Sequence, residues 1–213
     1  MRWMETERQA LVESFRTADP EAPTLCVGWN VRMLLGHLVQ REHNPWQRLM
    51  DVVGKAEPGH EKHLGALVAT AQTPEGYQAL LATFAAGTGP LNPMTWLGDA
   101  GQLLEYVIHH EDARRGAGPV PARELPAAQL DAMFKGMPLM AKLSYRSSPV
   151  GVSLARPDGE AVVVHKGGDG VVITGDPVEL ALYLSGRRAA ANVELKGSPD
   201  AVAAFTQWAG RKD

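Results

Sequence analysis

The sequence predicts an α+β fold in which a four-helix bundle, residues 1–118, precedes a small α+β domain, residues 119–213. Two patterns lead to this division. Apolar residues recur at three- and four-residue spacing through most of the first 118 residues, and they alternate at a spacing of two after residue 150. A Pro-Val-Pro sequence at residues 119–121 separates the patterns. The hydrophobic fraction of 45% in 213 residues is ample for two cores.

Start and stop signals define four helices in the first domain. Asn30 and Thr73 are good N-cap residues, and Asp99 followed by Gln102 three positions later resembles a capping box. The polar segment 54–65 is expected to be a loop or a poorly defined helix start. The four expected helices therefore cover residues 4–17, 31–43, 74–86 and 99–115.

The second domain is expected to contain both helices and strands. Two Gly-rich turns separate three short apolar strands, which predicts an antiparallel meander. Proline after Asp176 and after Ser198 marks two helix starts. In chain order the expected elements are a helix at 126–143, strands at 150–154, 161–165 and 171–174, a helix from 177, a strand at 193–195 and a helix from 199.

Composition limits the classes of partner and of metal site. The formal net charge is -3 without a basic block, and we find neither a secretory signal nor an apolar run that would span a bilayer. We therefore expect a cytoplasmic protein that binds no nucleic acid and no membrane. The single cysteine, Cys26, excludes an intrachain disulfide and a cysteine-rich zinc finger, which leaves histidines and carboxylates as metal ligands. Trp29, Trp46, Trp96 and Trp208 are expected to be core residues rather than ligand-stacking groups.

A carboxylate and an imidazole lie one turn apart on the fourth predicted helix. Glu105 and His109 share one face because their spacing is four residues, and His37 lies at the edge of the buried face of the second helix. Two histidines and a glutamate form a common zinc ligand set with an open position, and the same set suits non-haem iron(II). The other interpretation is a buried polar network around Glu105 with His37 as a core histidine. Spacing alone leaves both interpretations open.

Several short motifs resemble a known family. Gly28-Trp29, Gly36-His37-Leu38 and the run from Glu105 to Asp112 resemble the N-terminal domain of mycothiol-dependent maleylpyruvate isomerase-like proteins, which belong to the wider DinB-like metal-binding bundles. The residues of segments 23–29 and 109–115 resemble more closely those of an uncharacterised, mainly actinobacterial metal-binding branch. Segment 175–187 resembles the small C-terminal domain of the family, which is similar to sterol-carrier folds.

The resemblance implies that His37, Glu105 and His109 hold a divalent metal ion. Zinc is the first expectation, with nickel or iron(II) as the other choices. It also implies a low-molecular-weight thiol, such as mycothiol or bacillithiol, which the metal holds deprotonated for reaction with an electrophilic small molecule. The function expected is a thiol-dependent transferase or isomerase. The alternative is a non-enzymatic binding or regulatory module whose C-terminal domain holds an apolar ligand or a partner. The sequence indicates neither catalytic residues nor an oligomeric state.

Two charged residues could support the ligands. Arg41 lies four positions after His37, and Asp112 lies three positions after His109, so each is a candidate to orient a metal ligand. The alternative, which we favour from the sequence, is an interhelical salt bridge between Arg41 and Asp112. His110 points away from the ligand face by helical phase and is expected to be a surface or packing residue.

Other residues carry weaker signals. Arg187 and Arg188 are weak candidates to bind a carboxylate of the thiol or substrate in a cleft between the domains, and two solvated arginines are the favoured alternative. His60 and His63 have helical metal-ligand spacing, but their polar surroundings favour a solvated pair. Cys26 precedes the second helix and is expected to be a small buried residue rather than a ligand.

Overall fold

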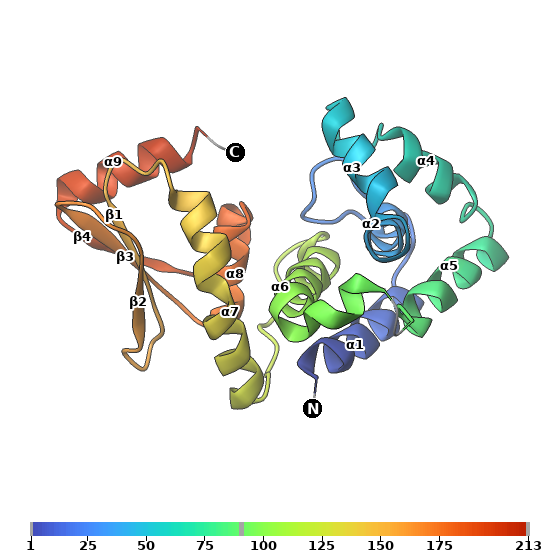
Figure 1. Ribbon diagram of the computed structural model, residues 1–213, viewed down its shortest axis with the longest axis horizontal. Coiled ribbons are helices and arrows are strands. Elements are labelled where there is room, and N and C mark those ends of the chain that lie inside the picture. The colour runs from blue at the N-terminus through green and yellow to red at the C-terminus, as the bar shows by residue number, and fades with distance from the viewer. Residues whose placement is uncertain (1, 90–91, 212–213) are drawn as a thin grey trace. The chain divides into compact units, whose positions relative to one another are not determined.

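The computed structural model describes residues 2–89 and 92–211, with the side chains of residues 93–97 outside the described part. The chain forms two compact units, Met1–Ala122 and Arg123–Asp213. The first unit is helical and the second combines a four-stranded sheet with helices (Figure 1), so the predicted α+β class is confirmed.

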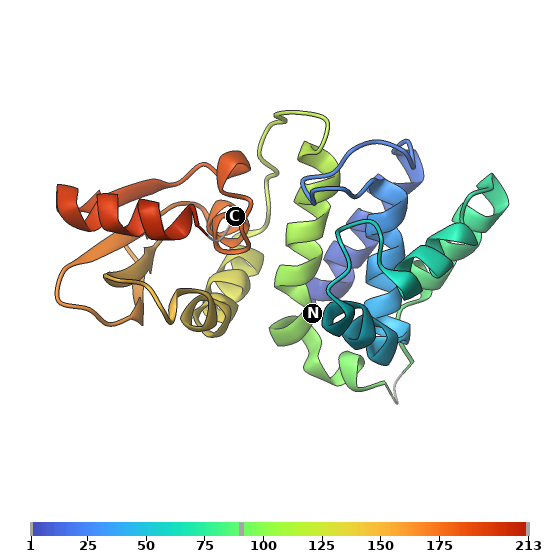
Figure 2. The same ribbon diagram turned by 90° about the horizontal axis from the view of Figure 1, so that it is seen from above.

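Six helices of the first unit lie within the described residues. Four of them match the predicted helices. Two short helices, α3 and α4, follow α2 and precede α5 along the chain (Figure 2). Of the two possibilities expected for segment 54–65, a loop or a helix start, the structure shows a loop that ends where α4 begins at Lys62. No helix among the described residues is both long and apolar enough to cross a bilayer. The helices are α1 (Trp3–Thr17), α2 (Val31–His43), α3 (Pro45–Gly54), α4 (Lys62–Ala69), α5 (Pro74–Ala86) and α6 (Pro93–Arg115).

The core of the helical unit lies among α1, α2, α5 and α6. Phe15, Phe84 and Tyr106 are fully buried there and pack edge to face, with ring centroids 6.2 Å apart for the first pair and 5.9 Å for the second. Leucines of α1 and α2, among them Leu11 and Leu35, fill the space around these rings. The aromatic rings thus join α6, which carries two of the predicted metal ligands, to α1 and α5.

A buried ion pair crosses this core. Arg8 of α1 donates from Nη1 to both carboxylate oxygens of Glu42 on α2, at 2.9 and 2.7 Å, and to the carbonyl of Phe84 on α5 at 3.0 Å. Its Nη2 donates to the hydroxyl of Tyr106 on α6 at 2.6 Å, and that hydroxyl donates to Glu42. One guanidinium therefore connects four helices.

The cap predictions are confirmed for α2 and α5, and the third predicted cap residue, Asp99, has an additional role. Asn30 and Thr73 each accept a backbone N–H bond at the start of α2 and α5. Gly98 has a φ of 52° and interrupts α6, so a straight helical segment starts at Asp99 as predicted. The carboxylate of Asp99, however, accepts the first backbone N–H groups of α1 at 3.1 and 2.8 Å. Asp99 thus caps α1, a contact that the sequence did not suggest.

The second unit contains a mixed sheet, and the predicted antiparallel meander is wrong. The strand order is β2-β1-β3-β4, with β1 antiparallel to β2 and parallel to β3, and β3 antiparallel to β4. Alternation in a sequence indicates which side chains share a face, but it does not identify the neighbouring strand. The elements are α7 (Ala127–Tyr145), β1 (Gly151–Ala155), β2 (Ala161–His165), β3 (Gly170–Thr174), α8 (Pro177–Leu184), a 3₁₀ turn (Arg188–Ala190), β4 (Glu194–Gly197) and α9 (Pro199–Ala209).

The tryptophans do not all lie in a core. Trp208 is buried beside Tyr145 and Phe205 in the second unit, and Trp29 is partly buried in the first. The core placement expected for Trp46 is wrong, because 79% of this residue is exposed. Trp96 lies outside the described side chains.

The buried ion pair gives a first prediction. Replacing Glu42 with alanine leaves the Arg8 charge buried without its carboxylate, so we expect a loss of about 3–5 kcal/mol in the free energy of unfolding, measured by urea denaturation. The matched control is Glu13→Ala on α1, which removes an exposed ion pair to Arg16 and should cost less than about 1 kcal/mol. Equal losses in the two variants would contradict the role assigned to the buried pair.

Candidate metal centre

Three side chains predicted from the sequence converge in the helical unit. Glu105 and His109 lie one turn apart on α6, and α2 brings His37 alongside them. The Oε1 atom of Glu105 is 3.3 Å from His109 Nε2 and 3.5 Å from His37 Nε2. The two imidazole rings are 5.0 Å apart at an interplanar angle of 70°. Both histidine side chains are buried, whereas the Glu105 side chain is 30% exposed, so solvent reaches this group from the glutamate side.

The spacing of these donor atoms fits a shared metal ion. Two donors bound to one tetrahedral zinc ion at about 2.0–2.1 Å lie about 3.3–3.4 Å apart. The two distances to Glu105 are close to this value, and they are longer than the usual N–H···O length of about 2.9–3.0 Å. One ligand atom from each of the three residues lies within 4.8 Å of the other two. Two imidazole nitrogens and a carboxylate oxygen are also the donor chemistry that zinc prefers.

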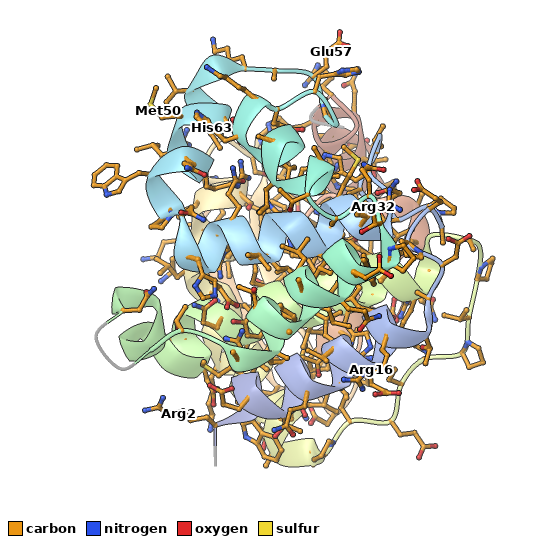
Figure 3. The ribbon with its side chains drawn as sticks, turned by 90° about the vertical axis from the view of Figure 1, so that its right-hand side faces the viewer. Arg2, Arg16, Arg32, Met50, Glu57 and His63 are labelled. Carbon is orange, nitrogen blue, oxygen red and sulfur yellow. The ribbon has the colours of Figure 1, made fainter. Side chains whose placement is uncertain are left out.

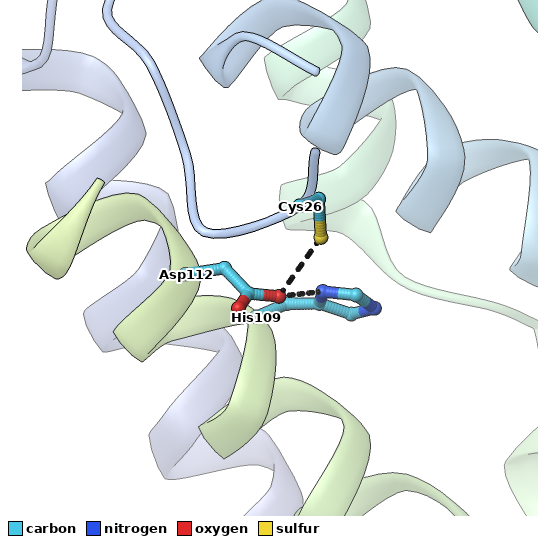
Figure 4. A group of neighbouring side chains, drawn as sticks. All are labelled: Cys26, His109 and Asp112. Carbon is cyan, nitrogen blue, oxygen red and sulfur yellow. Dashed lines mark hydrogen bonds and ion pairs between the residues drawn. The ribbon is translucent and has the colours of Figure 1, made fainter. Parts of the chain in front are cut away.

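The second ring nitrogen of His109 is held by a carboxylate (Figure 4). His109 Nδ1 lies 2.7 Å from Asp112 Oδ2, and the thiol of Cys26 donates to the same oxygen at 3.1 Å. These three residues also form a group with metal-binding donor types. The 2.7 Å contact is a hydrogen-bond length and is too short for two ligands of one tetrahedral ion. Asp112 therefore orients His109 so that Nε2 faces Glu105.

The loop before α2 places Cys26 against α6. The backbone N–H of Leu25 donates to the carbonyl of Asp112 at 3.1 Å, which docks the loop on the last turns of α6. Gly116 permits this approach, because a Cβ atom there would lie 2.0 Å from the carbonyl oxygen of Pro23. The sequence signal for this contact was weak, since a lone cysteine before a helix is usually a packing residue.

Arg41 and Asp112 have separate partners in the structure. The salt bridge between them that the sequence favoured is therefore wrong. Arg41 Nε lies 3.2 Å from Glu105 Oε1. Its other nitrogens donate to the side chain of Gln102 and, at 2.9 Å, to the carbonyl of Gly101. Arg41 thus fixes Glu105 and ties α2 to α6. The alternative kept open in the sequence, in which Arg41 and Asp112 each support one ligand, agrees with these contacts.

The two histidines differ in protonation. Burial lowers the pKa of His37 from 6.5 to about 4, although its contact with Glu105 acts in the opposite direction. Burial also opposes the charge on His109, but hydrogen bonds with Asp112, Cys26 and Glu105 raise its pKa well above 6.5. Burial raises the pKa of Glu105, yet bonds from both histidines hold it well below 4.5. Before any metal ion binds, these shifts favour a neutral His37, a charged His109 and an ionised Glu105 near pH 7.

The remaining predicted residues lie outside this group. Arg187 donates to the carbonyl of Ser185 at 2.7 Å, and Arg188 donates to the carbonyl of Ala209 at 3.1 Å, so both bind backbone within the second unit. Among the described residues, neither group with metal-binding donor types includes His60 or His63. His60 is exposed and His63 is half-buried.

A separate polar network surrounds His110, which is buried as a packing residue. His110 Nδ1 lies 2.7 Å from Glu7 Oε1, and its Nε2 lies 2.7 Å from Ser14 Oγ. Glu7 and Ser14 belong to α1, so this histidine joins α1 to α6. Helical phase correctly removed His110 from the ligand face, but it gave no indication of these partners.

Fold and geometry together define a helical bundle with a candidate metal centre, followed by a small α+β unit. The family model of the mycothiol maleylpyruvate isomerase N-terminal domain matches residues 3–114, and the chain belongs to this family. A structural comparison finds the "Crystal structure of the mycothiol-dependent maleylpyruvate isomerase" at 15% sequence identity and a TM-score of 0.40, covering 91% of this chain and 90% of that chain. A comparison with curated proteins gives no significant sequence match.

The bond between Asp112 and His109 gives a second prediction. Asp112→Asn keeps the side-chain size but removes the charge that orients His109, so zinc affinity should fall by about 10–100-fold in a chelator competition assay. His109→Ala should lose stoichiometric zinc. The control is His43→Ala, an exposed histidine of α2, which should bind zinc like the parent protein. Parent-like affinity in the Asp112 variant would contradict the orienting role.

The protonation of His109 gives a third prediction. His109 carries its proton at pH 7 because its pKa is raised, and a metal ion must displace that proton, whereas neutral His37 has none to lose. Zinc binding at pH 7 should therefore release about one proton, and affinity should rise about tenfold per pH unit until the pH passes the raised pKa. Calorimetry in buffers of different ionisation enthalpy measures this number. Release of no proton at pH 7 would show that His109 is neutral.

Proposed function

We propose that the helical domain binds a divalent metal ion, zinc in the first place, through His37, Glu105 and His109. The observation that carries this proposal is the convergence of two imidazole nitrogens on one carboxylate oxygen at 3.3 and 3.5 Å. Membership of the isomerase N-terminal domain family supports it. The support from Asp112 on the far side of His109 is the arrangement that histidine ligands of metal ions usually have.

The number of protein ligands supports a catalytic rather than a structural ion. Zinc sites with four protein ligands are closed, whereas catalytic sites have three and keep one position for water or substrate. Cys26 and Asp112 lie beside His109 Nδ1, while Nε2 is the atom that faces Glu105. They are thus unsuited to complete the same coordination shell. This count disfavours the alternative of a purely regulatory binding module.

We infer that the ligand of the open position is a low-molecular-weight thiol of the mycothiol or bacillithiol class. When bound, the metal ion supplies the positive charge that keeps such a thiol deprotonated near neutral pH. The residues of the chain contribute in the same direction. Arg41 offsets the charge of Glu105, so the surroundings of a divalent ion retain a net positive charge that favours an anionic sulfur.

The reaction class that follows is thiol-dependent transfer or isomerisation of an electrophilic small molecule. A thiolate is the nucleophilic form of a thiol, and holding it at a fixed position beside the substrate removes much of the entropic barrier. His37 and His109 are buried and the Glu105 side chain is partly exposed, which supports entry of thiol and substrate from the glutamate side.

Cobalt substitution tests this proposal directly. Protein loaded with Co²⁺ should gain an intense near-ultraviolet sulfur-to-cobalt charge-transfer band when mycothiol is added, because the thiolate binds the ion. The S-methyl derivative of mycothiol is the control ligand and should produce no band. His109→Ala protein is the control variant and should produce none with either compound. Full cobalt occupancy without a thiol-dependent band would refute thiol binding while leaving metal binding intact.

A further inference from the structure

Helix α3 exposes its apolar side chains. Trp46, Leu49, Met50 and Val53 are 79%, 48%, 60% and 66% exposed, and we refer to these four residues as the α3 stripe. Their spacing of three, four and seven residues from Trp46 places them on one face of the helix. Figure 3 shows Met50 at the outer edge of the helical unit, directed away from it.

The inward face of α3 carries a carboxylate, and this group fixes the rotation of the helix. Asp51 is 6% exposed and accepts hydrogen bonds from Gln40 Nε2 at 2.7 Å and from the backbone N–H groups of His63 and Leu64 at 3.0 Å each. The last two bonds satisfy amides at the start of α4. Rotating α3 to bury the stripe would break all three bonds. The exposed apolar face is therefore a consequence of defined contacts rather than of loose packing.

The area of the stripe is large for a single helix. Because a fully exposed large aromatic residue presents up to about 250 Å², the four side chains together expose roughly 500 Å². The largest apolar patch of a typical monomer covers about 300–600 Å² and is often functional. Two such faces placed together would bury about 1,000 Å², which reaches the lower limit for a specific interface between proteins.

We propose that the α3 stripe is the interface between two copies of this chain, with α3 of one copy packed antiparallel against α3 of the other about a two-fold axis. An interface of this symmetry must be complementary to itself, and an apolar face without charged side chains meets that requirement. The spacing of the stripe is also that of a two-helix seam.

The charges beside the stripe favour this occupant over a lipid surface. Helices that bind anionic membranes carry clusters of lysine and arginine next to their apolar face. Around the stripe, Arg48 and Lys55 are accompanied by Glu57, and the chain as a whole has a net charge of -3. A mixed rim of this kind suits a protein partner.

Analytical ultracentrifugation between about 1 and 100 µM tests the proposal, since an interface near 1,000 Å² predicts a weak dimer. The parent protein should change from monomer to dimer across this range. Met50→Glu combined with Val53→Glu should raise the dissociation constant at least about tenfold, because each copy would bury two charges at the interface. Trp46→Ala, a milder change, should also raise it. Val163→Glu on β2, where Val163 is 57% exposed, is the matched control and should dimerise like the parent.

Three results would overturn the proposal. The first is a parent protein that stays monomeric up to about 100 µM, and the second is equal dimerisation of all variants. The third is a monomeric parent that binds neutral phosphatidylcholine vesicles when the Met50/Val53 variant does not, which would identify lipid as the occupant. Circular dichroism and zinc content should be unchanged in every variant, because the substituted side chains lie outside the core and the metal centre.

Discussion

The Arg8–Glu42 ion pair determines where the candidate metal ligands meet. Glu42 lies on the same helix as His37, and Tyr106, the hydroxyl partner of Arg8, follows Glu105 directly in α6. The guanidinium therefore sets the distance between the two helices that supply the ligands, while Phe84 joins α5 to the same contact. A buried pair of this kind contributes little net stability when compared with apolar packing. Its value here is that it favours one arrangement of α2 against α6.

The two imidazoles are supported by different forces. His109 is held by Asp112, which also accepts the thiol of Cys26, so a charge and a docked loop fix its orientation. His37 Nδ1 is buried and has no hydrogen-bond partner among the described residues, and its ring packs 5.0 Å from Trp29. One ligand is thus positioned electrostatically and the other by packing. Substitutions around His109 should act through charge and pH, whereas those around His37 should act through volume.

Periodicity predicted the parts of this protein that depend on local geometry. Glu105 and His109 could be paired from their spacing alone, and Asn30 and Thr73 could be recognised as caps. From the sequence pattern His37 was only a candidate third ligand, because contact between helices depends on tertiary packing; the family resemblance then favoured it. The strand partners of β1 were predicted wrongly, and the contact of Asp99 with α1 was not predicted, for the same reason. Helix α3 departs from the rule that an amphipathic helix buries its apolar face, since it buries the carboxylate of Asp51 and exposes its apolar side chains.

The proposed function depends on one divalent ion that His37, Glu105 and His109 bind with an open coordination position. X-ray absorption at the zinc edge, on thiol-free protein purified without an affinity tag, tests this most directly. We expect one zinc per chain, with nitrogen and oxygen ligands at about 2.0–2.1 Å and the outer-shell scattering of two imidazoles. Protein without stoichiometric zinc, or a sulfur ligand at about 2.3 Å contributed by Cys26, would contradict it.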